Sequence, residues 1–588
     1  MDKQHNHNNS SQMRALLCPD THQNPSEGHG KESSSSDSTN QGAYSSSSPG
    51  PFRAENVSGA QAEGHDSVTK EGKEAKAGAS SCCQLNDLKR LPQCHMKLGP
   101  LRFDETHTVL INVECFNQTM QICPQKGREL WHSDFVKMPC SQIAYQSGSR
   151  QISRWDVIFN KLKSLASKKE VRVKDVEEAI IKYNPKYKDQ WSFDALCTFS
   201  KMIPETENYF KTLFPKIAAL ALKLPDLVKK AIPLLRKGRS ATITLSQYQI
   251  SCLLANAFFC TFPHRNTSRP NAEYSGYPSI NFNSLFEKWS ARKREKLRAI
   301  MHYFKVVTDE HTQPEGLVTF ERRCLSNTDT SKWKSCKETL SKLHVTSEGQ
   351  IEADGKGMLQ VDFASSWIGG GVLGSGLLQE EILFLMNPEL IVARLFTEKL
   401  EDNECLIITG SQQFSSYSGF GDTFEWAGPY QDNFERDEWA RLKRQILAID
   451  ALKFRDRTEQ YNRKHIFREL NKAYCGFKRY HEYEEPDIAT GKWGCGAFNG
   501  DPQLKAVIQL MAAAKAKRGL AFFTFMDKHL EQNLEQIYHL MVTEKVTVEK
   551  LCKLLEDFCS QHHRSHVDLF EFIDKNIRAS SRPSKSLL

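Results

Sequence analysis

Short β-rich runs alternate with helical stretches from residue 317 onward, and this alternation limits the folds open to the chain. The β-rich runs read LVTF, KLHVTS, GMLQVDF, ECLIIT, ILAIDAL and AFFTF. Helical patterns occupy residues 380–386, 388–400 and 502–517. Strands interleaved with helices at this spacing predict an α/β layered domain with much of its sheet parallel. In such sheets ligands bind at loops that follow the carboxyl ends of strands.

The 588-residue length predicts more than one structural unit. We expect a disordered low-complexity tail over residues 1–84, because SSSSDSTN and YSSSSPGP bury too little apolar surface. Residues 85–153 contain LRFDETHTVLINVECF, whose alternation of apolar and polar residues suggests an extended covering segment. Helical spacing dominates residues 154–310, the α/β domain spans residues 311–560, and residues 561–588 form a C-terminal tail.

One helix of the 154–310 region has a clear start signal. Ser246 and Gln249 stand at the three-residue offset of a capping box, just before an apolar run. The run places Ile250, Leu253 and Leu254 on one face, together with Ala257 and Phe258. We therefore expect the helical region to have a core of its own.

Composition excludes several classes of protein. No apolar run approaches the ~20 residues of a membrane span, and the N-terminus lacks a signal-peptide pattern. The 17 cysteines form no C-x-x-C pair, and Cys94, His95, His107 and Cys115 fit no common zinc spacing. With a net charge of +8 from 79 basic and 71 acidic residues, a sequence-specific nucleic-acid surface is not indicated. We expect a protein of the cytoplasm and nucleus, without a metal.

The glycine-rich stretch GGGVLGSGLLQEE covers residues 369–381. Gly369, Gly371 and Gly374 match G-x-G-x-x-G, the pattern of a dinucleotide-binding turn. However, residues 364–368 separate these glycines from the preceding strand, and Arg394 stands where that turn needs an acidic residue. A dehydrogenase is therefore a distant alternative. Glycines before a helix still predict an anion-binding loop.

Two adjacent carboxylates, Glu380 and Glu381, follow that loop, and Asp362 ends the strand before it. Acidic residues in a first helical turn are often only partners of the helix dipole. Three carboxylates near a bound anion repel one another, which raises at least one pKa. A carboxyl group still protonated near neutral pH is what glycosidic cleavage requires.

Several motifs in order carry a family resemblance. The segment VDFASSWIGGGVLGSGLLQEEILFLMNPELIVARLFTE resembles the signature of the poly(ADP-ribose) glycohydrolases, especially the vertebrate enzymes. CLLANAFFCTFP, YPSINFNSLF, NECLIITG, RELNKAYCGF and GKWGCGAFNGD extend the resemblance over roughly residues 94–551. It implies a macrodomain-like α/β fold with a mixed sheet flanked by helices, preceded by a helical accessory region.

The resemblance also implies an activity: hydrolysis of the ribose–ribose O-glycosidic bonds of poly(ADP-ribose), including chains attached to proteins, with release of ADP-ribose. It implies no cofactor, a monomer, and a role in the DNA damage response. Glu381 would be the general acid and then the base, Glu380 would hold ribose hydroxyls, and Asp362 would complete the catalytic loop.

The implied substrate-binding residues that match the family pattern fall into three groups. Ile351 and Glu352 would contact adenine, with Gln379 beside them. Phe525 and Phe498 would be aromatic walls of the adenosine pocket. The remaining positions would hold the diphosphate and ribose: Gly369, Gly370, Gly371, Trp493, Gly494, Cys495, Gly496 and Ala497.

Three positions depart from the family pattern. Ser365 and Lys492 each stand where the family usually has Asn, and Phe420 stands where it has Tyr. Phe420 keeps a stacking surface but loses a hydroxyl hydrogen bond, worth about 0.5 to 1.5 kcal/mol. Since the three carboxylates are retained, we expect an active glycosidase. The alternative is a catalytically weakened protein that binds poly(ADP-ribose) as a reader.

Overall fold

The computed structural model of the chain describes residues 81–95, 97–143, 152–204, 207, 209–265, 271–330, 332–561 and 568–581. The chain divides into two compact units, residues 1–75 and 76–588, and all described residues lie in the second. The disorder expected for residues 1–84 therefore lies outside the described residues as far as residue 80.

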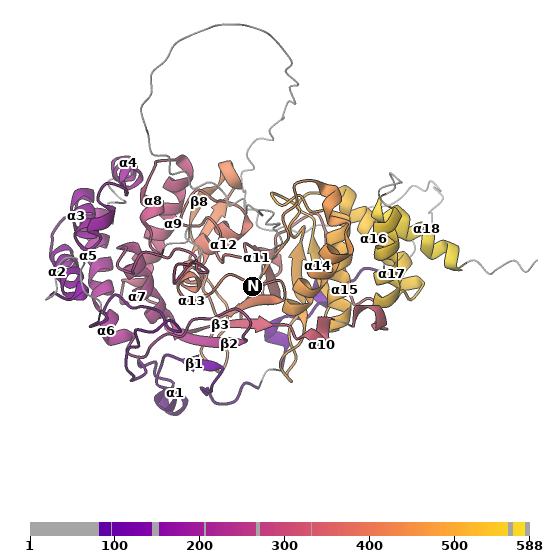
Figure 1. Cartoon of the computed structure of the whole chain (residues 1–588), viewed down its shortest axis with the longest axis horizontal. Coiled ribbons are helices and arrows are strands. Elements are labelled where there is room, and N and C mark those ends of the chain that lie inside the picture. Colours follow the sequence, from indigo (N-terminus) through magenta and orange to yellow (C-terminus); the bar gives the residue numbers. More distant parts are fainter. Residues whose placement is uncertain are drawn as a thin grey trace, which may run out of the picture. The chain divides into compact units, whose positions relative to one another are not determined.

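A mixed sheet of nine strands, counted over the described residues, organises the second unit (Figure 1). Its strand order is β1 (His107–Val109), β2 (Ala241–Ser246), β3 (Leu317–Cys324), β6 (Glu404–Thr409), β9 (Gln445–Asp450), β5 (Leu359–Ala364), β10 (Ile488–Gly491), β11 (Leu520–Phe523) and β4 (Leu343–Thr346). From β9 to β4 every pairing is parallel, whereas β2, β3, β6 and β9 pair antiparallel. The carboxyl ends of five strands therefore meet at one edge.

Alternate residues of the central strands enter two different cores. On β9, Ile446 and Ala448 belong to one hydrophobic cluster, and Leu447 and Ile449 belong to the other. Each face of the sheet is thus covered by helices, as a largely parallel sheet requires. The macrodomain-like α/β architecture predicted from the sequence is confirmed.

The first core includes the accessory helices, which follow one another along the first half of the chain (Figure 1). They are α2 (Arg154–Ala166), α3 (Val173–Tyr183), α4 (Asp194–Met202), α5 (Tyr209–Leu222), α6 (Leu224–Leu227), α7 (Gln247–Phe258), α8 (Asn283–Phe286) and α9 (Ala291–Val307). The predicted capping box is present at α7: Oγ of Ser246 accepts the N–H of Gln249, and Oε1 of Gln249 accepts the N–H of Ser246, each at 3.0 Å. Because Ser246 also ends β2, the box sets the turn from strand to helix.

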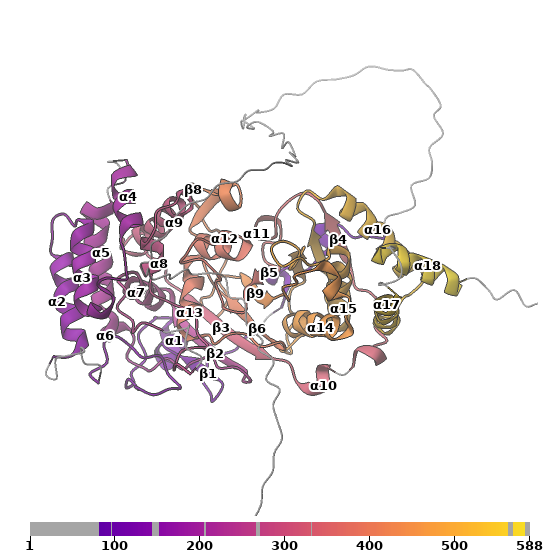
Figure 2. The same cartoon turned by 45° about the horizontal axis from the view of Figure 1, so that its top comes forward.

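The second core holds the C-terminal helices, which Figure 2 shows beyond β5 and β9. They are α14 (Arg463–Phe477), α15 (Pro502–Ala516), α16 (Lys528–Thr543), α17 (Val548–Gln561) and α18 (Leu569–Ser581). No helix among the described residues is both long and apolar enough to cross a membrane.

Some sequence expectations differ from the structure. The predicted covering segment supplies β1 and the helix α1 (Val113–Thr119), and the predicted helical region supplies β2, so the sheet crosses the expected boundary at residue 310. The C-terminal residues expected to form a tail contain α18, whose Leu569, Ile573 and Ile577 are buried in the second core. The helix expected over residues 388–400 is only a 3-10 turn, η6 (Pro388–Val392), and α13 (Ala393–Phe396).

Candidate active site

Asp362 lies inside β5, with a fully buried side chain. Neither of its carboxyl oxygens has a hydrogen-bond partner in the described part of the chain. Burial, and then the nearby Glu381, raise the pKa of Asp362 well above its usual range. Burial and the neighbouring carboxyl group therefore both favour the protonated form of Asp362 over the carboxylate.

The helix α12 (Gln379–Met386) docks where two strands separate. β10 pairs with β5 only at Leu359 and Gln360. Beyond Gln360, the amide side chain of Gln379 makes the hydrogen bonds to the β5 backbone that β10 no longer makes. Its Oε1 accepts the N–H of Phe363 at 2.8 Å, and its Nε2 donates to the carbonyl of Val361 at 3.3 Å. Gln379 thus fixes the start of α12 against the carboxyl end of β5.

Glu380 is buried and held by two backbone amides. The N–H of Ser365 donates to its Oε2 at 2.8 Å, and the N–H of Gly369 donates to its Oε1 at 2.6 Å. Burial, Asp362 and Glu381 together raise the pKa of Glu380, while the two amides act in the opposite direction. The pKa values of Asp362 and Glu380 are both raised, as expected for at least one carboxyl, but burial is the first cause and the neighbouring carboxyl groups come second.

Glu381, like Glu380, accepts one backbone N–H at each of its two carboxyl oxygens. Its Oε1 accepts the N–H of Gly371 at 2.8 Å, and its Oε2 accepts the N–H of Leu378 at 2.8 Å. Because Leu378 is the N-cap residue of α12, the second bond is half of a capping box. Both glutamates also lie in the first turn of the helix, where its dipole favours negative charge.

The glycines are required because the carboxylates pack directly against them. A Cβ on Gly370 would lie 2.5 Å from Oε1 of Glu381 and 2.8 Å from Oε2 of Glu380, and φ at Gly370 is +44°. A Cβ on Gly376 would lie 2.7 Å from Oε1 of Glu381. In this structure the N–H groups of the loop hold the chain's own Glu380 and Glu381 side chains, and binding of an external anion by this loop stays a prediction. A diphosphate cradle at Gly369, Gly370 and Gly371 stays a prediction, since all three N–H groups already donate within the protein.

Three cationic side chains hold the carbonyl oxygens of the same loop. Lys296 on α9 donates from Nζ to Gly371, Val372 and Gly374 at 3.1, 3.0 and 2.9 Å. Arg292 donates to Ser375 at 3.1 Å. Arg394 on α13 donates to Ile368 at 2.8 Å and to Gly370 at 3.0 Å.

The sequence analysis did not assign these cations to the site. The signal that could have found Lys296 is its place among the buried apolar residues of α9. Arg394 interrupts the apolar run ELIVARLF in the same manner.

The loop after β10 is more open than the glycine loop. Trp493 is fully buried, and its indole N–H donates to the carbonyl of Ile449 at 3.0 Å, so its side chain anchors the loop. Gly494 has φ of +75° and Gly496 and Ala497 are exposed. No hydrogen bond within the described ranges engages the N–H groups of Gly494, Gly496 or Ala497. These amides are available to an anion.

Three further side chains border that loop. Nζ of Lys492 lies 3.5 Å from Oδ2 of Asp527. Burial raises the pKa of the Cys495 thiol to about 12, which keeps it protonated. Phe498 packs partly against the second core.

The predicted adenosine-binding residues divide into buried and exposed ones. Ile351 is buried on α11 (Ile351–Asp354), and Glu352 accepts a hydrogen bond from the hydroxyl of Tyr417. Phe525 is 37% exposed and follows β11 in a left-handed conformation with φ of +52°. Phe420 is 54% exposed and follows β7 (Ser415–Ser418), which pairs with β8 (Glu425–Pro429). Strained backbone at Phe525 is a feature often found at binding sites.

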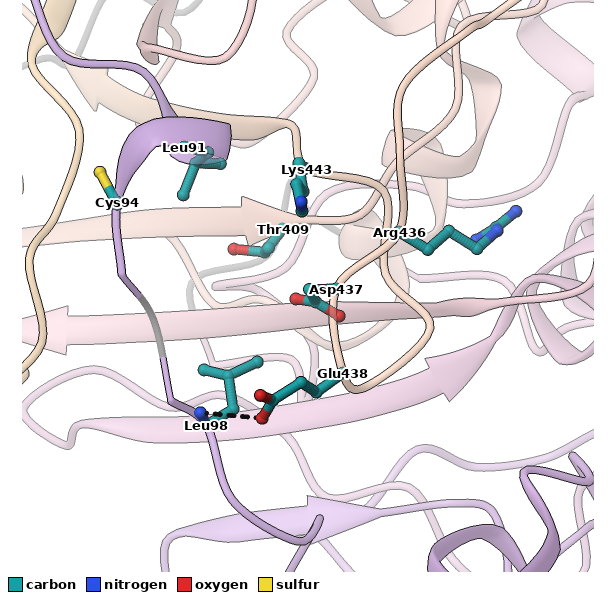
Figure 3. Close-up of a pocket in the computed structure, with 8 residues that line it drawn as sticks. All are labelled: Leu91, Cys94, Leu98, Thr409, Arg436, Asp437, Glu438 and Lys443. Atoms are coloured by element: carbon teal, nitrogen blue, oxygen red, sulfur yellow. Dashed lines mark hydrogen bonds between the residues drawn. The ribbon is translucent and has the colours of Figure 1, made fainter.

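A separate pocket of ≈ 230 Å³ lies at the other edge of the sheet (Figure 3). It is bordered by Thr409, which pairs with Gln445 at the start of β9, whereas Asp362 pairs with Ala448 further along. Its Glu438 accepts the N–H of Leu98 at 3.1 Å. Within the described residues, no group of three or more His, Cys, Asp or Glu side chains is arranged to hold a metal ion.

Comparison with known proteins gives consistent matches. The family description "Poly (ADP-ribose) glycohydrolase (PARG), helical domain" matches residues 203–322, and "Poly (ADP-ribose) glycohydrolase (PARG), Macro domain fold" matches residues 330–532. Poly(ADP-ribose) glycohydrolase 1 of Arabidopsis thaliana is 30% identical over 474 residues, which cover 65% of this chain and 85% of the relative. Poly(ADP-ribose) glycohydrolase 1 of Caenorhabditis elegans is 32% identical over 418 residues, which cover 67% of this chain and 51% of the relative.

A solved structure also aligns with part of the chain. It is the poly(ADP-ribose) glycohydrolase of Thermomonospora curvata bound to the inhibitor ADP-HPD, with 16% identity over 36% of this chain and 83% of that chain. Its TM-score of 0.23 is too low to support an argument. The two family matches and the Arabidopsis relative are sufficient by themselves: the chain belongs to the poly(ADP-ribose) glycohydrolase family.

Proposed function

We propose that this chain is a glycosidase that hydrolyses the ribose–ribose O-glycosidic bonds of poly(ADP-ribose) and releases ADP-ribose. The observation that carries the proposal is the cluster of three buried carboxyl groups at the carboxyl end of β5: Asp362, Glu380 and Glu381. Its function follows from the chemistry of the bond, since expulsion of a ribose hydroxyl requires a proton donor and then a base for water.

The reaction uses Glu381 as the group that transfers the proton. Its carboxyl group protonates the leaving ribose oxygen as positive charge develops on the other sugar, and the carboxylate then takes a proton from the attacking water. Each oxygen of Glu380 accepts one amide and keeps a second lone pair, which can accept a ribose hydroxyl. A proton on Asp362 lowers the negative charge of the cluster, which makes a buried triad of carboxyls tolerable.

The diphosphate of the substrate binds at the loop after β10. The N–H groups of Gly494, Gly496 and Ala497, which no hydrogen bond of the described residues engages, are donors for it, and Lys492 adds positive charge beside them. The exposed rings of Phe420 and Phe525 supply stacking surfaces for the bases. The glycine loop, by contrast, positions carboxylates.

Release of ADP-ribose from labelled poly(ADP-ribose) tests this proposal. Glu381→Gln is expected to abolish release, because an amide cannot donate the catalytic proton, while binding of the polymer stays within about threefold of wild type, because the diphosphate and the bases bind elsewhere. Glu389→Gln is the matched control, because Glu389 is fully buried beside α12 but bonds Gln247 and Gln412 instead of the site. Polymer binding by the wild-type protein without any release would favour the reader alternative.

Three finer features belong to the same proposal. The chain acts in the cytoplasm and nucleus, in the DNA damage response, which imaging of a fluorescent fusion before and after strand breakage tests. It is a monomer, which light scattering tests. It is of the vertebrate type, as its CLLANAFFCTFP and GKWGCGAFNGD motifs suggest, and a phylogeny of family members tests this.

A further inference from the structure

Arg394 is a buried cation without an ion pair within the part of the chain that the structure describes. Its side chain is 6% exposed, and its Nε donates to the carbonyl of Ser279 at 2.8 Å. Its Nη1 donates to Ile368 at 2.8 Å and to Gly370 at 3.0 Å. Burial lowers the pKa of Arg394 to about 10, which leaves the guanidinium charged at neutral pH.

The two carbonyls that Arg394 binds belong to the peptide groups that hold the glutamates. In a trans peptide the C=O and the next N–H point in opposite directions within one plane, and the described backbone contains no cis peptide. The peptide between Ile368 and Gly369 accepts Arg394 on one side and donates to Glu380 on the other, at 2.8 and 2.6 Å.

The peptide between Gly370 and Gly371, two positions further along the chain, has the same arrangement. Between Gly370 and Gly371, the carbonyl accepts Arg394 at 3.0 Å and the N–H donates to Oε1 of Glu381 at 2.8 Å. One nitrogen atom of one arginine is therefore linked, through two planar groups, to one oxygen of each glutamate. Hydrogen bonds in such a chain polarise one another, so the cation strengthens both amide donors.

An arginine with a purely structural role would donate its hydrogen bonds to groups outside the glycine loop, and Arg518 is an example. Arg518 is equally buried, at 1% exposure, and burial lowers its pKa to about 10 as well. It donates to the carbonyls of Phe477 and Pro486 and to Glu485, none of which belongs to the glycine loop. Arg394 differs because both acceptors of its Nη1 sit back to back with carboxylate-binding amides.

We propose that Arg394 is a positioning residue for the glycosidase reaction, acting through the 368–369 and 370–371 peptides to orient and charge-stabilise Glu380 and Glu381. The inference rests on the proposed function. Without Arg394, the glycines at 369, 370 and 371 give these two peptides freedom to rotate. The amides would then no longer fix the two carboxylates, although the polymer-binding loop after β10 would be untouched.

The pH dependence of the reaction depends on the charged and titratable groups that surround Glu380 and Glu381. Asp362 faces them from β5, and Lys296 and Arg292 approach the loop from α9. Removal of the Arg394 charge leaves all three in place and takes away a cation that interacts with Glu380, so the pKa of Glu380 rises further. Because Glu380 accepts ribose hydroxyls best as a carboxylate, the acid limb of the pH–rate profile is expected to move to higher pH.

The test compares Arg394→Gln, Arg394→Lys and the matched control Arg518→Gln in the full chain. For Arg394→Gln we expect kcat on labelled poly(ADP-ribose) to fall on the order of 100-fold, as for an ångström-scale misplacement. KM and ADP-ribose affinity should stay within about threefold, and the acid limb should shift upward. Arg394→Lys should recover part of kcat, because an ammonium can donate to both carbonyls. Arg518→Gln should lower thermal stability but keep kcat and the acid limb.

Hydrogen exchange over residues 366–381, read by mass spectrometry, is a second measurement that does not need turnover. We expect faster exchange in Arg394→Gln and unchanged exchange in Arg518→Gln. A wild-type kcat and pH profile in Arg394→Gln, or equal loss of kcat in both glutamine variants, would overturn the inference. Failure of the wild-type protein to release ADP-ribose would instead refute the proposed function, so the two failures are distinguishable.

Discussion

Replacement of Gly370 by alanine should disable catalysis through geometry alone. The new Cβ would lie 2.5 Å from Oε1 of Glu381 and 2.8 Å from Oε2 of Glu380. Because real Cβ contacts essentially never fall under 3.0 Å, the Glu381 oxygen must retreat by at least 0.5 Å. The same oxygen accepts the N–H of Gly371 at 2.8 Å, so the retreat strains that bond.

The expected magnitude follows from two costs. Backbone in the left-handed region, at φ of +44°, costs an L-residue about 1 to 2 kcal/mol. Weakening one hydrogen bond to a buried carboxylate adds about 1 to 2 kcal/mol. We therefore expect the free energy of unfolding to fall by about 2 to 4 kcal/mol. Displaced carboxylates should lower kcat on the order of 100-fold.

Steady-state release of ADP-ribose and thermal unfolding measure both effects. Gly374→Ala is the matched control, since its Cβ would meet only the carbonyl of Gly371 at 3.7 Å. It should keep kcat within about threefold. If Gly370→Ala kept the wild-type kcat and instead raised KM tenfold, the loop would be a diphosphate cradle and not a support for the glutamates. That result would refute the reasoning from the structure.

Two further predictions concern Lys296 and α18. Burial lowers the pKa of Lys296 to about 7, and only its ammonium form has three N–H groups for three carbonyls, so activity should fall as pH rises through about 7. Lys296→Arg stays charged and should keep its activity to higher pH; an unchanged alkaline limb would contradict this assignment. Deletion of residues 562–588 removes α18 and exposes the core beneath Leu569, Ile573 and Ile577, at about 1.5 to 3 kcal/mol each. A calorimetric melting temperature equal to that of the full chain would contradict a structural role for α18.

The sequence was sufficient where the signal is local. The apolar run of β5 and the Ser246 capping box of α7 are features of consecutive residues, and both were predicted correctly. β10 was missed because IATG is only four residues long and ends in glycine. The helix expected over residues 388–400 overran, because periodicity alone did not mark the end of α13 at Phe396.

The site required contacts that local patterns do not encode. A glycine loop before a helix predicts an anion, but it does not say whether the anion is a ligand or a side chain of the same protein. Lys296 reaches Gly371 from 75 residues away, and Tyr417 reaches Glu352 from 65 residues away. A lysine in an apolar helical stripe signals a buried partner without identifying it. Only the three-dimensional structure identifies the carbonyl groups that Lys296 contacts.

The layered arrangement of charge explains why the cations do not contact the glutamates directly. A guanidinium paired face to face with Glu380 or Glu381 would occupy their free lone pairs and strongly favour the carboxylate form. With a peptide group between them, Arg394 still balances buried negative charge, while burial keeps the pKa values of Asp362 and Glu380 high. Each glutamate oxygen also keeps one lone pair free for substrate. Gly370 makes this approach possible, since a Cβ there would lie 2.5 Å from Oε1 of Glu381 and 2.8 Å from Oε2 of Glu380 and would push both carboxyl groups away from the peptide planes.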